Sequence, residues 1–239
     1  MKKLILSLVT LITVTAFAQE KTVVADANAQ KRTLNGSFTG ITVTDGVDLY
    51  LTQGNEESVA VSASEQKYMD RFKTVVENGI LKIYFDNSGI NWALNDKRKL
   101  KAYVSFKTLE KLHASGGANV KLEGTVDAGN LDLKFTSGAA FEGNLKAKDL
   151  TVEQNSGSAI NISGNADKIN VEVSSGAVFK GYELAVDYCE AKASSGGGVR
   201  ITINKELSAK ANSGGGVRYK GSAVIKDINV NSGGSVKKA

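Results

Sequence analysis

The sequence predicts an all-β protein, a single-domain right-handed parallel β-helix in which each coil of chain hydrogen-bonds to the next. Three observations predict this fold: a motif that recurs about every 19–20 residues, an alternation of apolar and polar residues around it, and the absence of proline from 239 residues. Proline lacks the N–H group that a β-ladder needs. A chain built almost wholly of ladders can therefore do without it.

The recurring motif is a Ser-Gly pair followed by small residues and then an apolar one. A fixed period near 20 residues is typical of a solenoid. Glycine adopts positive φ without steric cost, which suits a sharp corner between strands. In the first repeat Gly116-Gly117 fits the corner better than Ser115-Gly116, and this alignment places Val120 in the core. The predicted corner glycines are Gly117, Gly138, Gly157, Gly176, Gly196, Gly214 and Gly233.

Apolar and polar residues alternate on both sides of each corner. Ile169, Val171 and Val173 precede one corner, and Phe179 follows it. Strict alternation indicates strands with one face in the core and one in solvent. An antiparallel sandwich would instead need turn signals every 8–12 residues. The β-helix is the favoured interpretation.

Residues 33–106 are also β-rich, but they are less regular. Asp45-Gly46 resembles a degenerate corner, and Asn78-Gly79 predicts a hairpin with a type I′ turn. We expect this half to begin the same solenoid and to cap its first rung. With no linker in between, residues 33–238 are predicted to form one domain.

The first 18 residues predict a signal peptide. Lys2 and Lys3 precede an apolar run, and Ala16-Phe17-Ala18 supplies a cleavage site. An uncleaved anchor is the alternative, but the run is shorter than the about 20 apolar residues that span a bilayer. Residues 19–32 are expected to form a flexible N-terminal segment. The predicted location is the periplasm, the outer surface or the medium, with no integral membrane segment after signal removal.

Three segments in a fixed order resemble a known family. They are FTGITVTDGVDLYLTQGNEESVAVSA from Phe38, ENGILKIYF from Glu77 and KLHASGGANVKLEG from Lys111, followed by the Ser-Gly repeats. This order resembles the putative auto-transporter adhesin, head GIN domain family, over nearly all of the chain after the signal peptide. The resemblance implies an exported β-solenoid with an adhesin or cell-envelope binding role, and it brings no catalytic residues.

The residues themselves also argue against an enzyme. His113 is the single histidine, and Cys189 occupies an inward position where other rungs have Leu or Ile. Neither zinc spacing nor a calcium-binding β-roll motif is present. The carboxylates are scattered, although Glu153 and Glu172 should be neighbours on adjacent rungs. We expect no catalytic residue, no metal and no cofactor; a polysaccharide lyase or hydrolase on a β-helix scaffold is the alternative.

One solvent-facing position is basic in four successive rungs, at Lys180, Arg200, Arg218 and Lys237. We call these residues the cationic row. An extended acidic glycan could follow it, whereas the alternative is that flanking Glu183, Asp187 and Glu206 neutralise it. The formal net charge of +5 is spread along the chain, which does not favour nucleic-acid binding.

Two further hypotheses concern partners. Trp92 is a candidate aromatic contact for a sugar, although it could equally anchor its own loop. The last rung shows no evident polar cap, and an open rung is an edge that could pair with another copy. An end-to-end homodimer, or a structural self-assembling envelope protein, is the corresponding expectation.

Overall fold

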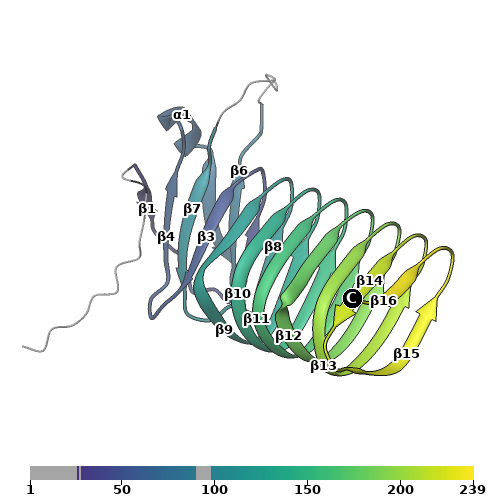
Figure 1. Cartoon of the computed structure of the whole chain (residues 1–239). Helices are drawn as coiled ribbons and strands as arrows, with labels where there is room; N and C mark the ends of the chain where they lie inside the picture. The colour runs from purple at the N-terminus through teal and green to yellow at the C-terminus, as the bar shows by residue number, and fades with distance from the viewer. Residues whose placement is uncertain (1–25, 27, 90–97) are drawn as a thin grey trace, which may run out of the picture.

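The computed structural model describes residues 26, 28–89 and 98–239 as a stack of coils wound around one axis (Figure 1). The described chain is an all-β structure with 65% of its residues in strands, in a solenoid of about seven turns with rungs of about 19 residues. The predicted β-helix is confirmed. No helix among the described residues has the length and apolar character needed to cross a membrane.

The regular part of the solenoid consists of long strands, each of which bends around one whole coil. Every strand pairs in parallel with the next, so that Phe141 lies beside Ile160 and Ile160 beside Phe179. The last coils contain shorter strands, and β14 and β15 pair with β13 while β16 pairs with β14. The strands are β9 (Asn119–Phe135), β10 (Ala140–Gln154), β11 (Ala159–Val173), β12 (Val178–Ala193), β13 (Gly198–Ala211), β14 (Gly216–Lys220), β15 (Val224–Val230) and β16 (Ser235–Lys238).

The corners form a single hydrogen-bonded column. The amide of Gly157 donates to the carbonyl of Ser175 at 3.1 Å, and the amide of Gly176 donates to the carbonyl of Ser195 at 3.1 Å. Every predicted corner glycine has positive φ. The preceding serine is also in the left-handed region, with φ of 52° at Ser156. The sequence analysis did not anticipate this second positive φ.

The residue after the corner is small because it lies against the previous coil. At Gly197 an added Cβ would lie 2.5 Å from the carbonyl oxygen of Val173. In other coils this position holds Ala139 or Ala177, both fully buried. Inside the solenoid, Phe135 and Phe141 pack edge to face with ring centroids 5.5 Å apart. Cys189 is buried in the same core, as its inward position predicted.

The N-terminal half joins the same stack, but its coils do not lie in chain order. β2 lies between β6 and β8, and β3 lies between β7 and β9. The coil that contains β6 and β7 therefore lies nearer the N-terminal end of the stack than the coil that contains β2 and β3. These strands are β2 (Gly40–Val43), β3 (Asp48–Gln53), β6 (Ile80–Phe85), β7 (Lys101–Phe106) and β8 (Lys111–Ala114).

Antiparallel strands close this end of the solenoid. β4 (Ser58–Ser62) pairs with β7, and β5 (Phe72–Glu77) forms the predicted hairpin with β6. Asn78 and Gly79 both have positive φ, as a type I′ turn requires. A single helical turn, α1 (Gln66–Met69), follows β4. The expectation that this half caps the first rung agrees with these pairings.

The expected flexible segment at residues 19–32 needs a correction at its end. Gln30–Arg32 form β1, which pairs antiparallel with β4 and extends the sheet beyond it. The Arg32 guanidinium donates to the carbonyl of Met69 at 2.9 Å. These main-chain and side-chain bonds order Gln30–Arg32. The predicted signal peptide, residues 1–18, lies outside the described residues, as do Gln19 to Ala25.

Candidate functional site

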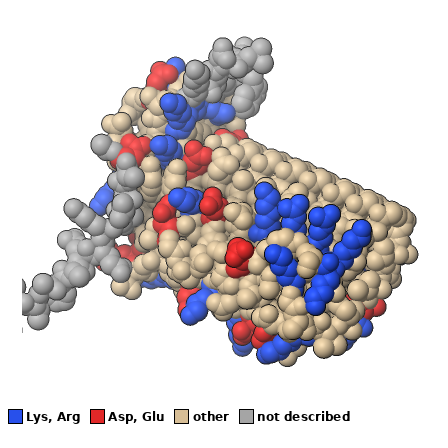
Figure 2. All heavy atoms as spheres, in the orientation of Figure 1, with Lys and Arg blue, Asp and Glu red and all other residues tan. Residues whose placement is uncertain are grey.

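The strand register brings the cationic row together on the face of the solenoid that follows the corner column. Lys180 pairs with Arg200, Arg200 with Arg218, and Arg218 with Lys237. All four side chains are exposed, and adjacent rungs are about 4.8 Å apart. Figure 2 shows Lys and Arg side chains gathered over these C-terminal coils. Since like charges at this spacing repel one another, the row is a region of concentrated positive potential.

The flanking acids do not neutralise the cationic row by direct pairing. Asp187 lies 2.6 Å from Lys205 Nζ, and Glu206 lies 3.0 Å from Lys226 Nζ. The hydrogen bond with Asp187 raises the pKa of Lys205, so this lysine stays charged. Within the described part of the chain, no member of the cationic row makes a side-chain hydrogen bond or ion pair, and neither does Glu183.

The same position in the coils toward the N-terminal end holds other kinds of side chain, and these extend the row. Tyr50 and Tyr103 stack with centroids 5.2 Å apart and an interplanar angle of 13°. The row thus begins with aromatic rings, passes through mixed polar groups and ends in cations. In spatial order its members before Lys180 are Tyr103, Tyr50, Lys121, Glu142 and Asn161.

A shoulder of mostly small residues runs beside this row, one alternate position closer to the corners. A hollow of about 330 Å³ lies on this face, lined by residues of both rows from Asp48 and Tyr50 to Lys180. Asn119 Nδ2 donates to Asp48 Oδ1 at 2.9 Å, which fixes these two larger side chains. The shoulder consists of Asp48, Asn119, Ala140, Ala159, Val178, Gly198, Gly216 and Ser235.

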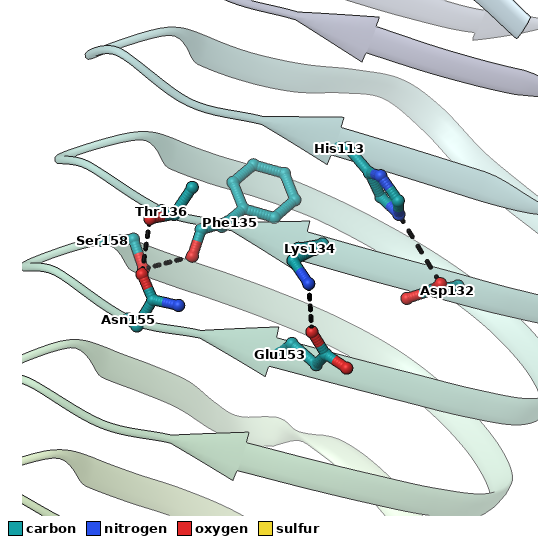
Figure 3. A network of polar contacts seen from close by, with 8 residues as sticks. All are labelled: His113, Asp132, Lys134, Phe135, Thr136, Glu153, Asn155 and Ser158. Atoms are coloured by element: carbon teal, nitrogen blue, oxygen red, sulfur yellow. Dashed lines mark hydrogen bonds and ion pairs between the residues drawn. The ribbon is translucent and has the colours of Figure 1, made fainter.

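The face that precedes the corner column, which we call the paired face, is arranged differently, because several of its charges are paired. Lys134 Nζ lies 2.6 Å from Glu153 Oε2, and His113 Nε2 lies 3.5 Å from Asp132 Oδ2 (Figure 3). The hydrogen bond with Glu153 raises the pKa of Lys134. In spatial order, the row on this face carries both bases and acids: His113, Lys134, Glu153, Glu172, Lys192 and Lys210.

The residues considered for catalysis do not form a convergent set. Glu153 and Glu172 are neighbours, as expected, but Glu153 is engaged by Lys134, while Glu142 lies on the other face. Burial raises the pKa of the Cys189 thiol to about 12, which leaves it protonated near neutral pH. No group of His, Cys, Asp and Glu within residues 26, 28–89 and 98–239 could hold a metal ion.

One residue predicted for the site lies outside the described residues, and one feature of the site was not predicted. Trp92, the candidate aromatic contact, lies outside the described residues. The tyrosine stack and the hollow were missed, because they depend on β3 lying between β7 and β9. The one available signal was the Asp45-Gly46 corner, which aligns Tyr50 with Lys121 when it is superposed on Gly116-Gly117.

The fold and this face define a β-solenoid that presents a long, regular surface. The chain belongs to the family described as "Putative auto-transporter adhesin, head GIN domain", whose model matches residues 37–223. No curated protein matches the sequence.

Solved structures share the fold at low sequence identity. A putative adhesin from Bacteroides fragilis has a TM-score of 0.80 and 17% identity, over 88% of this chain and 96% of that chain. A putative adhesin from Parabacteroides distasonis has a TM-score of 0.69 and 20% identity, over 88% and 96%. A "putative lipid binding protein" from the same species has a TM-score of 0.60 and 19% identity, over 90% and 98%.

Proposed function

We propose that this chain is an exported, non-catalytic, adhesin-like protein that binds an acidic glycan of the cell envelope or cell surface along its cationic row. The observation that carries the proposal is a row of four exposed cations at rung spacing with no acidic partner among the described residues. The family description supports an adhesin-like role, and the predicted signal peptide supports export.

A regular row of charges favours a regular polymer. Surface cations are usually accompanied by acids, as on the paired face, since isolated like charges in a row repel one another. A linear polyanion that lies along the solenoid axis would meet one cation per rung and relieve this repulsion. The shoulder residues beside these cations, Gly198 and Gly216 among them, leave the row open to a chain from one side.

The proposal excludes a reaction on the bound glycan. Cleavage by general acid and base needs two groups that converge on one bond. Of the two acids considered from the sequence, Glu153 is engaged by Lys134, and its neighbour Glu172 lies with it on the face away from the cationic row. Incubation with polygalacturonate should therefore release no reducing ends or unsaturated products, and their release would favour the lyase or hydrolase alternative.

The binding test compares two double variants of equal charge change. Arg200→Ser/Arg218→Ser removes two members of the cationic row, from β13 and β14, and Lys192→Ser/Lys210→Ser removes two lysines from the paired face, from β12 and β13. Two exposed ion pairs contribute up to about 1 kcal/mol each, so the first variant should bind polygalacturonate about tenfold more weakly. Equal affinity of the two variants, measured by calorimetry or biolayer interferometry, would contradict the proposal.

Self-association is a second candidate function, favoured by one observation at the C-terminal coil. Val224, Ile225, Ile228 and Val230 of β15 are 40–71% exposed, although such residues are buried in earlier coils. We propose an end-to-end homodimer in which this coil meets that of a second copy. Ile228→Ser/Val230→Ser should then convert a dimer to a monomer in light scattering. A monomeric wild-type chain at high concentration would contradict this proposal.

A further inference from the structure

We infer that the ligand of this face is a polysaccharide whose sugar rings enter the hollow beside Ala140 and Ala159 while its acidic groups lie on the cationic row. This inference rests on the proposed function and deepens it. It adds a ring-binding subsite, and with it a reason why a glycan should be chosen over other linear polyanions.

The floor of the hollow suits the flat side of a sugar. Ala140 and Ala159 are adjacent members of the shoulder, between the larger Asn119 and Val178. Their methyl groups and the backbone between them offer an apolar surface, and polar side chains of the neighbouring row also line the hollow. Pockets for small polar ligands combine an apolar surface with a few placed donors and acceptors in this way.

Polar side chains that line the hollow are available to form hydrogen bonds with sugar hydroxyls. Within the described chain, the side chains of Glu142 and Asn161 make no hydrogen bond or ion pair, although both line the hollow. A carboxylate accepts hydrogen bonds, and an amide both donates and accepts. Lys121 lies 3.4 Å from Glu123, a contact long enough to be exchanged for a ligand oxygen.

Glu142 also determines which part of the polymer the hollow can accept. An anionic group of the ligand would be repelled at this rung, whereas a hydroxyl would be bound. The acidic groups are instead attracted from Lys180 onward, where no acid stands in the row. The face therefore selects a polymer that carries both hydroxyls and acidic groups.

An aromatic ring closes the hollow at its N-terminal end. Tyr50 lines it and stacks on Tyr103, which is only 7% exposed and is held by the sheet behind it. The stack therefore holds the Tyr50 ring in one orientation. A tyrosine combines an apolar ring with a hydroxyl group and can contact both parts of a sugar.

The hollow and the cationic row form one continuous surface, since Lys180 belongs to both. From Tyr50 to Lys237 the row crosses seven rung steps, which at about 4.8 Å each gives about 34 Å. One extended glycan can span this length with roughly one sugar per rung. Affinity for oligogalacturonates should rise with length up to about eight sugars and then level off.

The deciding experiment compares two anionic probes, oligogalacturonate and inorganic polyphosphate, which has no sugar rings. Ala140→Ile/Ala159→Ile fills the hollow without changing the charge. Ala185→Ile is the control, because Ala185 is an exposed strand alanine like Ala159 but lies outside the hollow. Circular dichroism and thermal unfolding establish that each variant is folded.

We expect the filled variant to bind oligogalacturonate about tenfold more weakly than the control while its polyphosphate affinity is unchanged. Equal effects on both probes, or no effect on either, would overturn the inference of a sugar subsite. The same conclusion would follow if the wild type bound polyphosphate but not oligogalacturonate. Failure of the proposed function is distinguishable, because Arg200→Ser/Arg218→Ser would then leave the binding of both probes unchanged.

Discussion

The two faces that flank the corner column carry charged side chains in different arrangements. On the face before the corner column, Lys134 is engaged by Glu153 and Lys192 by Glu190 at 3.1 Å. On the face after it, Lys180, Arg200 and Arg218 lie side by side with no acid between them. Both faces belong to the same strands at the same spacing, so the backbone does not dictate the difference. We infer that the paired face serves stability and the cationic face serves binding.

The largest expected effect concerns the corner column, on which both faces depend. Gly197→Ala places a Cβ against the carbonyl oxygen of Val173 and should destabilise the protein by about 2–3 kcal/mol. Gly198→Ala is the control, because a Cβ there meets nothing within 4 Å. Denaturant unfolding measures both. Equal stabilities of the two variants would show that the coils are not packed as closely as described.

The next effect concerns the core between the faces. Cys189→Ser buries a hydroxyl in an apolar site and should cost about 1–2 kcal/mol, whereas Cys189→Val should be nearly neutral. Chemical unfolding of the two variants makes the comparison. A serine variant as stable as the valine variant would mean that water or a polar partner reaches this position.

The buried Cys189 thiol should also make the stability of the protein depend on pH. Its pKa is raised from 9.0 to about 12 by burial, so above pH 9 the unfolded state loses this proton while the folded state keeps it. Stability should therefore fall as pH rises from about 9 toward 12, and less so in Cys189→Val. Identical pH profiles for the wild type and Cys189→Val would contradict a buried, protonated thiol.

The smallest effect sharpens the comparison of the faces most directly. Arg200→Glu places an acid between Lys180 and Arg218, so that opposite charges become neighbours there, as Lys134 and Glu153 are on the paired face. Cross-strand opposite charges contribute up to about 1 kcal/mol, so the variant should be slightly more stable than the wild type while binding polygalacturonate more weakly. A destabilised variant that still binds fully would reverse the roles assigned to the two faces.

Local patterns in the sequence predicted most of the regular part of the fold. The corner at Gly157 and the alternation at Ile169 and Val171 depend only on nearby residues, and so does the placement of Arg200 beside Arg218 once the period is known. The nested order of the N-terminal coils could not be predicted, because pairing partners such as β2 and β6 are far apart in the chain. The hollow and the Tyr50 stack follow from that order.

The most direct test of the central claim compares polygalacturonate with its methyl-esterified form, which keeps the sugar rings but lacks the charges. If the cationic row carries binding, the acidic polymer should bind more tightly, and its advantage should shrink as salt is raised from 50 to 500 mM, because exposed charges are screened. Equal affinity for the two polymers at low salt, or an advantage that persists at high salt, would contradict the account.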